Sequence, residues 1–178
     1  GFEAEWLERK AILAEYGFEA PGAILTQLAA TIDPYRMAYQ LFSRVVARGG
    51  EVYDRTQMET MTPDDQGVTL TLANGAKLRC QYVVMAAGYE SQDWLPEKVA
   101  VNRSSYALIT DPLPPEALVK LRHTMMWESS RPYLYMRTTC DGRLLVGGDD
   151  DDEDIPKRRD ARVEEKAEGL TAKIATLW

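Results

Sequence analysis

The stretch from residue 67 to residue 88 constrains the fold most. In "VTLTLANGAKLRCQ" apolar residues at positions 68, 70 and 72 alternate with polar ones, which predicts a strand with one buried face. The Asn-Gly pair that follows predicts a two-residue hairpin turn. The return strand runs into "YVVMAAG", which is apolar without alternation, as in a strand covered on both faces. This stretch therefore predicts a hairpin followed by a central strand.

Two helices are expected upstream of the hairpin. Residues 3–17 predict an amphipathic helix that ends at Gly17 and places four apolar side chains near one stripe: Trp6, Leu7, Leu13 and Tyr16. A second helix is expected to begin with Asp33 as N-cap and Pro34 at the first helical position, and to end at Gly49-Gly50. Residues 51–53 then predict a short strand, so this part reads as an α/β unit.

The second half of the chain has the character of an antiparallel sheet. Short strands are expected at residues 105–110, 123–128, 133–139 and 142–148, with Asp-Gly in the turn between the last two. A helix is expected from residue 160 to about residue 177. The predicted fold class is α+β, with mixed and antiparallel sheet and flanking helices.

A composition shift near residues 92–102 gives the expected internal boundary. Residues 1–91 would hold the lead helix and the helix–strand–hairpin–strand part, and residues 92–178 the antiparallel sheet with its C-terminal helix.

Composition excludes several classes of protein. A net charge of −7 argues against a nucleic-acid surface, and no apolar run approaches the roughly 18 residues of a membrane span. Cys80 and Cys140 show neither metal-ligand spacing nor a disulfide framework, which predicts a reduced, cytoplasmic protein. The oligomeric state is open at this point.

The small residues that end "YVVMAAG" have two interpretations. A strand end without bulky side chains lets a ligand approach the backbone closely, and ligands of open α/β sheets sit outside the carboxyl ends of strands. Alternatively, Ala86, Ala87 and Gly88 make room for a neighbouring helix.

The order of these features resembles a known family. A "DP" helix start, Gly-Gly, "TQM", the "NG" hairpin, "VVMAAG" and "DGRLLVGG" follow one another over about residues 20–150. This succession is similar to the D-amino-acid oxidase-like family of FAD-dependent oxidoreductases, of the glycine oxidase and sarcosine oxidase type. The resemblance implies hydride transfer to FAD from a small amine, amino acid or 2-hydroxy acid.

The resemblance also implies roles for individual positions. Met58 matches a place whose backbone meets the adenine of FAD, and Ala86, Ala87 and Gly88 match the small-residue strand end beside the dinucleotide. Residues 92–178 match the substrate domain, in which Tyr133 would be a pocket tyrosine. Asp150, two positions after the glycine pair of "VGG", would also line the pocket.

The sequence departs from the family at both ends. It has no G-x-G-x-x-G, the turn that holds the dinucleotide phosphates, and it lacks the C-terminal glycine-rich segment. We therefore expect the central fragment of a flavoenzyme, inactive and without bound FAD on its own. The alternative is a non-catalytic α+β protein-interaction module.

Three further features each have two interpretations. Tyr133, Tyr135 and Arg137 alternate along one strand face, so Arg137 either binds a substrate carboxylate or packs over the aromatic rings. His123, the only histidine, is either a general base or, as we expect, a structural or exposed residue. The acidic run at 149–154 is expected to be solvated and to bind no metal, with Asp149 and Asp150 as exceptions.

Overall fold

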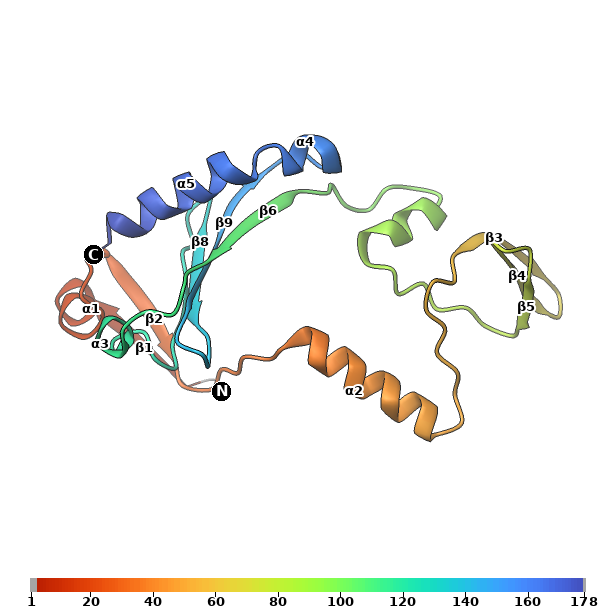
Figure 1. Ribbon diagram of the computed structural model, residues 1–178, viewed down its shortest axis with the longest axis horizontal. Helices are drawn as coiled ribbons and strands as arrows, with labels where there is room; N and C mark the ends of the chain where they lie inside the picture. The colour runs from red at the N-terminus through yellow and green to blue at the C-terminus, as the bar shows by residue number, and fades with distance from the viewer. Residues whose placement is uncertain (1–2, 178) are drawn as a thin grey trace. The chain divides into compact units, whose positions relative to one another are not determined.

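The computed structural model describes residues 3–177 and divides into two compact units (Figure 1). Residues 1–28 and 99–178 form the first unit, and residues 29–98 form the second. From the sequence we expected the lead segment, residues 1–28, to belong with residues up to 91. In the structure it packs with residues 99–178.

The first unit contains a four-stranded antiparallel sheet in the order β6-β9-β8-β7. Its strands are β6 (Ser104–Ile109), β7 (Met125–Trp127), β8 (Leu134–Thr138) and β9 (Leu144–Asp151). All four predicted strands are present, and Gly142, at φ 79°, lies in the predicted turn between β8 and β9. The α+β fold class is confirmed.

One long helix covers this sheet. Helix α5 (Val163–Ala175) runs along β6 and β9 (Figure 1), after two short helices, α3 (Pro115–Leu118) and α4 (Pro156–Asp160). Val146 of β9 and Leu170 of α5 are fully buried, and the sheet and helix share one apolar cluster. The buried members of this cluster are Tyr106, Leu121, Leu134, Met136, Leu144, Val146 and Leu170.

The predicted helix over residues 3–17 is correct for residues 9–16 but wrong for residues 4–8, which form a strand. Strand β1 (Ala4–Glu8) precedes helix α1 (Arg9–Tyr16) and pairs antiparallel with β2 (Gly22–Thr26). The ring of Trp6 lies where a Cβ on Gly22 would be, so the glycine permits this pairing. Because the pairing partner lies further along the chain, the local 3.6-residue periodicity did not reveal it.

The buried side of this lead segment is also narrower than predicted. Leu7 and Tyr16 are buried together with Ile12, but Trp6 and Leu13 are exposed.

The second unit contains helix α2 (Pro34–Ala47), a three-stranded sheet and η1 (Gly88–Trp94). The sheet has the order β3-β4-β5, made of β3 (Met58–Asp64), β4 (Gly67–Leu72) and β5 (Lys77–Cys80). Asp33 caps α2 as predicted, since its Oδ1 accepts a 3.0 Å hydrogen bond from the backbone N of Arg36. The predicted hairpin is confirmed, with Gly75 at φ 81°.

Two predicted strands of the second unit do not form. Residues 51–53 and 82–87 adopt no regular structure. A strand needs a neighbour for its backbone N–H and C=O groups, and no strand among residues 3–177 pairs with either segment. Tyr82 and Val84 consequently stay 85% and 86% exposed.

The second unit buries little apolar surface. Leu72 is the only buried apolar residue among residues 29–98, all of which are described, and α2 has no buried residue at all. Within residues 3–177 no helix is both long and apolar enough to cross a bilayer.

Candidate functional site

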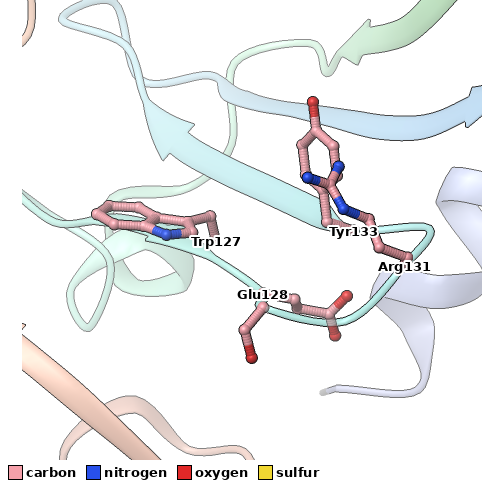
Figure 2. Close-up of a pocket in the computed structure, with 5 residues that line it drawn as sticks. Trp127, Glu128, Arg131 and Tyr133 are labelled. Carbon is pink, nitrogen blue, oxygen red and sulfur yellow. The ribbon is translucent and has the colours of Figure 1, made fainter.

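A pocket of about 330 Å³ opens at the turn between β7 and β8 in the first unit. Its lining residues come from the end of β7 and from the turn, and they are Trp127, Glu128, Ser129, Arg131 and Tyr133 (Figure 2). Aromatic rings and two opposite charges therefore share one small cavity.

Glu128 shapes the turn that carries the pocket. Its backbone N donates to the carbonyl of Leu134 at 2.8 Å, and its Oε2 accepts from the backbone N of Leu134 at 3.1 Å. The same oxygen accepts from the hydroxyl of Ser130 at 3.3 Å. Because one carboxylate oxygen receives both donors, Glu128 fixes the start of β8 beside Tyr133.

Arg131 lies over Tyr133. Its guanidinium carbon is 4.9 Å from the centre of the Tyr133 ring, and Figure 2 shows the two side chains against each other. The electron-rich ring face attracts the cation, so Arg131 and Tyr133 support each other in the pocket wall. The Tyr133 ring also lies 6.0 Å from the ring of Tyr135, which confirms the predicted shared strand face.

Asp150 approaches the pocket through Arg131. Its Oδ2 is 4.0 Å from Nη1 of Arg131, and its side chain is 16% exposed. Its Oδ1 is buried without a hydrogen-bond partner among the described residues. The structure thus brings Asp150 and Tyr133 to the same arginine, with Asp150 behind the residues that line the cavity.

The two glycines of "VGG" make room for the two tyrosines. A Cβ on Gly147 would overlap the ring of Tyr135, and a Cβ on Gly148 would overlap the backbone carbonyl of Tyr133. Gly148 also has φ 133°, a conformation that side chains rarely adopt. The glycine pair is therefore a local requirement for packing β9 against the residues of the pocket wall.

The acidic run is only partly solvated, which corrects the sequence prediction. Residues 149–151 belong to β9, and Asp149 and Asp151 form ion pairs with lysines of α5, whereas Asp152 and Asp154 are exposed. Asp149 binds Lys166 at 2.8 Å and Lys173 at 2.7 Å, and Asp151 binds Arg162 at 2.6 Å. The predicted exception of Asp149 is confirmed, but Asp151 was missed.

These ion pairs change the pKa values of their members. Hydrogen bonds from Lys166 and then Lys173 lower the pKa of the Asp149 carboxyl, although burial opposes them. Burial would raise the pKa of Asp151, but a backbone hydrogen bond from Glu153 and the nearby cations lower it below its usual value. Burial opposes the charge on Lys166, but hydrogen bonds to Asp149 and Asp151 raise its pKa.

Two other candidates lie outside the pocket. Arg137 is at the far end of β8, about 13 Å along the strand from Tyr133 at roughly 3.3 Å per residue, and it does not line the cavity. His123 is exposed in the turn before β7, at φ 63°. Among residues 3–177 no cluster of three or more His, Cys, Asp or Glu side chains could hold a metal ion.

The residues expected to contact FAD lie in the second unit. Met58 is half-buried at the start of β3, and Ala86 and Ala87 are exposed. Gly88 opens η1 at φ 59°, and a Cβ there would meet no atom within 4 Å. An exposed backbone with open space around it fits a contact with the edge of a dinucleotide. None of these residues forms a phosphate-binding turn.

The sequence did not reveal Trp127, Glu128 or Arg131 as pocket residues. They lie at the end of a short strand and in an irregular turn. In such a turn neither helical nor strand periodicity predicts which side chains meet. The only available signal was the Ser-Ser-Arg-Pro sequence directly before Tyr133, which marks a turn.

Comparison with known proteins was made on the whole chain. The family model DAO, FAD dependent oxidoreductase, matches residues 1–178. No curated protein matches the chain. Eight chains of solved structures match it.

Two of these structures are amino acid oxidases by their descriptions. Glycine oxidase from Geobacillus kaustophilus matches with a TM-score of 0.74 and 18% identity, over 99% of this chain and 47% of that chain. NikD, an unusual amino acid oxidase essential for nikkomycin biosynthesis, matches in its open form with a TM-score of 0.59 and 18% identity. That match covers 94% of this chain and 48% of NikD. At this identity the likeness shows the fold, and the chain spans about half of either structure.

Proposed function

Because the chain belongs to the family of FAD-dependent oxidoreductases, we propose that it carries the substrate pocket of an enzyme that oxidises a small amine, amino acid or 2-hydroxy acid. The first unit supplies the pocket, and the second unit supplies part of the surface that receives FAD. The observation that carries this proposal is the position of Tyr133, which lines a cavity of about 330 Å³ under the guanidinium of Arg131.

The pocket chemistry suits a small polar substrate. The phenol of Tyr133 can donate a hydrogen bond to a substrate oxygen, and Trp127 supplies apolar surface. Asp150 acts on the pocket through Arg131, whose Nη1 lies 4.0 Å from its Oδ2. Arg137 is a weaker candidate for holding a carboxylate, because it lies further along β8.

The chain's own residues bind and orient the substrate. The chemistry that FAD supplies in such enzymes is acceptance of a hydride from the carbon that bears nitrogen or oxygen. Tyr133 fixes the polar end of the substrate so that this carbon is presented in one orientation, and Asp150 supports this arrangement through Arg131.

The second unit takes part in cofactor binding. Met58, Ala86, Ala87 and Gly88 present backbone to the dinucleotide, and the pyrophosphate is held by another segment of the enzyme. The purified chain should accordingly show no visible flavin absorbance. A stoichiometric flavin band would contradict this division of the cofactor site.

A cytoplasmic location fits this enzyme, since Cys80 and Cys140 are both free thiols. The alternative of a non-catalytic module is less well supported, because the family model covers both units.

The decisive experiment compares Tyr133→Phe with Tyr135→Phe in an enzyme that contains this chain. Both changes remove one hydroxyl from the same strand face, but only Tyr133 lines the pocket. Loss of a hydrogen bond to a charged substrate group costs about 1.5–3 kcal/mol. We expect kcat/KM to fall about ten- to a hundredfold for Tyr133→Phe, and much less for Tyr135→Phe. Equal kinetics for both variants would remove Tyr133 from the site.

A further inference from the structure

The residue that follows the glycine pair, Asp149, is held by two lysines of α5. Nζ of Lys166 donates to the backbone carbonyl of Asp149 at 2.9 Å and to its Oδ2 at 2.8 Å. Nζ of Lys173 donates to Oδ1 at 2.7 Å. Both carboxylate oxygens and the carbonyl are therefore occupied. We call Asp149, Lys166 and Lys173 the lysine clamp.

Lys166 is placed where only a strong interaction can keep it charged. It is 8% exposed, and its Nζ also lies 5.1 Å from the centre of the Tyr106 ring. A buried ammonium group is unfavourable unless carboxylates or carbonyls surround it. The position of Lys166 is thus fixed by Asp149 and, at 3.3 Å, by Asp151.

The clamp acts on an irregular point of β9. Asp149 has φ 53° and follows Gly148 at φ 133°, and the pairing of β6 with β9 shifts register at this place. Such a bulge re-aims the residues around it. Aspartate tolerates the left-handed conformation but does not favour it, so interactions from outside the strand must hold it there.

The same point supports Tyr133. The backbone N of Asp149 donates to the carbonyl of Tyr133 at 3.2 Å, and Gly148 lies so close that a Cβ would overlap this carbonyl. The contacts run without interruption from Lys166 and Lys173 through Asp149 to the backbone of Tyr133. A shift of Asp149 would therefore move the tyrosine that lines the pocket.

We propose that Lys166 and Lys173, acting through Asp149, are positioning residues for Tyr133. This role rests on the proposed function of the pocket, but the coupling itself is a property of the chain without substrate or cofactor. Helix α5 then sets the geometry of the pocket wall as well as covering the core.

An internal control separates this coupling from simple docking of the helix. Arg162, next to the start of α5, binds Asp151 at 2.6 Å, so it also joins the helix to β9. It has no contact with Asp149 among the described residues. Loss of Arg162 should weaken the attachment of α5 and leave the hydrogen bonds from both lysines to Asp149 in place. Because Arg162 and Lys166 share Oδ2 of Asp151, the cleaner comparison is between Arg162→Met and Lys173→Met, whose ion pair is with Asp149 alone.

The test is NMR spectroscopy of the chain with ¹³C-labelled tyrosine. Tyr133→Phe identifies the Tyr133 signal among the nine tyrosines by its loss. We expect Lys166→Met and Lys173→Met to shift or broaden the Tyr133 signal, because its ring senses the nearby Arg131 and Tyr135. The control Arg162→Met should leave this signal in place.

Asp149→Asn serves as a second variant if Lys166→Met does not fold. Asparagine keeps the shape of the side chain and the tolerance for positive φ but removes the charge that binds both lysines. It should also move the Tyr133 signal. An unchanged Tyr133 signal in the folded clamp variants, or an equal change in Arg162→Met, would overturn the proposal.

Such a result would leave the proposed function standing, since the kinetics of Tyr133→Phe test that separately. Conversely, a moved signal would support the clamp even if Tyr133 proved unimportant for turnover.

Discussion

The two units of this chain differ in how they use their apolar residues. The first unit closes a sheet and a helix over a shared core in which Val146 and Leu170 are fully buried. In the second unit α2 has a clear apolar pattern, yet Met37, Leu41 and Val45 remain 45%, 48% and 43% exposed. Packing therefore buries the apolar face of α5, whereas the apolar face of α2 stays about half exposed and packing contributes less to its stability.

This difference bears on function. The turn that carries the pocket joins two strands that the first unit pairs, so it is anchored at both ends within the chain. The segment expected to meet FAD lies in the unit that buries only Leu72. We infer that the substrate side is preorganised in this chain, whereas the cofactor side depends on further contacts.

The largest expected effect compares two leucines on helices. Leu170→Ala creates a cavity in the core of the first unit and should lower the free energy of unfolding by about 2–5 kcal/mol. Leu41→Ala, on the exposed face of α2, should change it by less than about 0.5 kcal/mol. Chemical denaturation followed by circular dichroism measures both, and equal losses would abolish the contrast between the units.

Substitution of one glycine in each unit compares how tightly the two units pack around a single residue. Gly148→Ala should cost at least about 2 kcal/mol, because the Cβ overlaps the Tyr133 carbonyl and the backbone conformation excludes it. Gly88→Ala meets no atom and carries only the strain of its positive φ, about 1 kcal/mol within the second unit, so it should leave the unfolding transition of the first unit unchanged. Thermal unfolding of both variants provides the test. A Gly148→Ala protein as stable as the parent would refute the close-packing argument.

Acid should weaken the first unit through the lysine clamp. The folded-state pKa of Asp149 is lowered, so its contribution is present above the unfolded-state pKa near 3.8 and is lost as the pH falls through the folded-state pKa. Asp149→Asn should reduce the change in the free energy of unfolding with pH over this range.

The matched control is Asp64→Asn in the second unit. A hydrogen bond from Arg79 lowers the pKa of Asp64 to about 2, and Asp64 belongs to the second unit. Loss of the Asp64 charge should not alter how the unfolding of the first unit depends on pH. Identical profiles for Asp149→Asn and the parent, measured by denaturation between about pH 5 and pH 2, would contradict the account.

The sequence predicted features that depend on neighbouring residues. Asp33 and Pro34 start α2 as expected, and the Asn-Gly pair turns between β4 and β5, because capping and turn chemistry act within a few residues. Simple alternation placed Tyr133, directly before β8, and Tyr135, within β8, on one face. Patterns that depend on a few neighbouring residues therefore gave correct predictions.

What the sequence did not reveal depends on distant partners. Residues 4–8 pair with residues 22–26 instead of extending the helix, and residues 82–87 lack a strand neighbour. Asp149 meets Lys166 only because α5 folds back along β9. Strand pairing and ion pairs between distant segments produce no periodic pattern in the sequence. The pocket turn and the lysine clamp could therefore not be predicted.

The most direct test of the central claim is amide hydrogen exchange on the chain, resolved by residue. The amides of β8 and β9 should exchange slowly, including that of Leu134, which donates to Glu128 beside the pocket. The amides of residues 82–87 should exchange close to the rate of an unfolded chain. Equal protection of the two regions would show that the cofactor side is as ordered as the pocket, and would contradict the account.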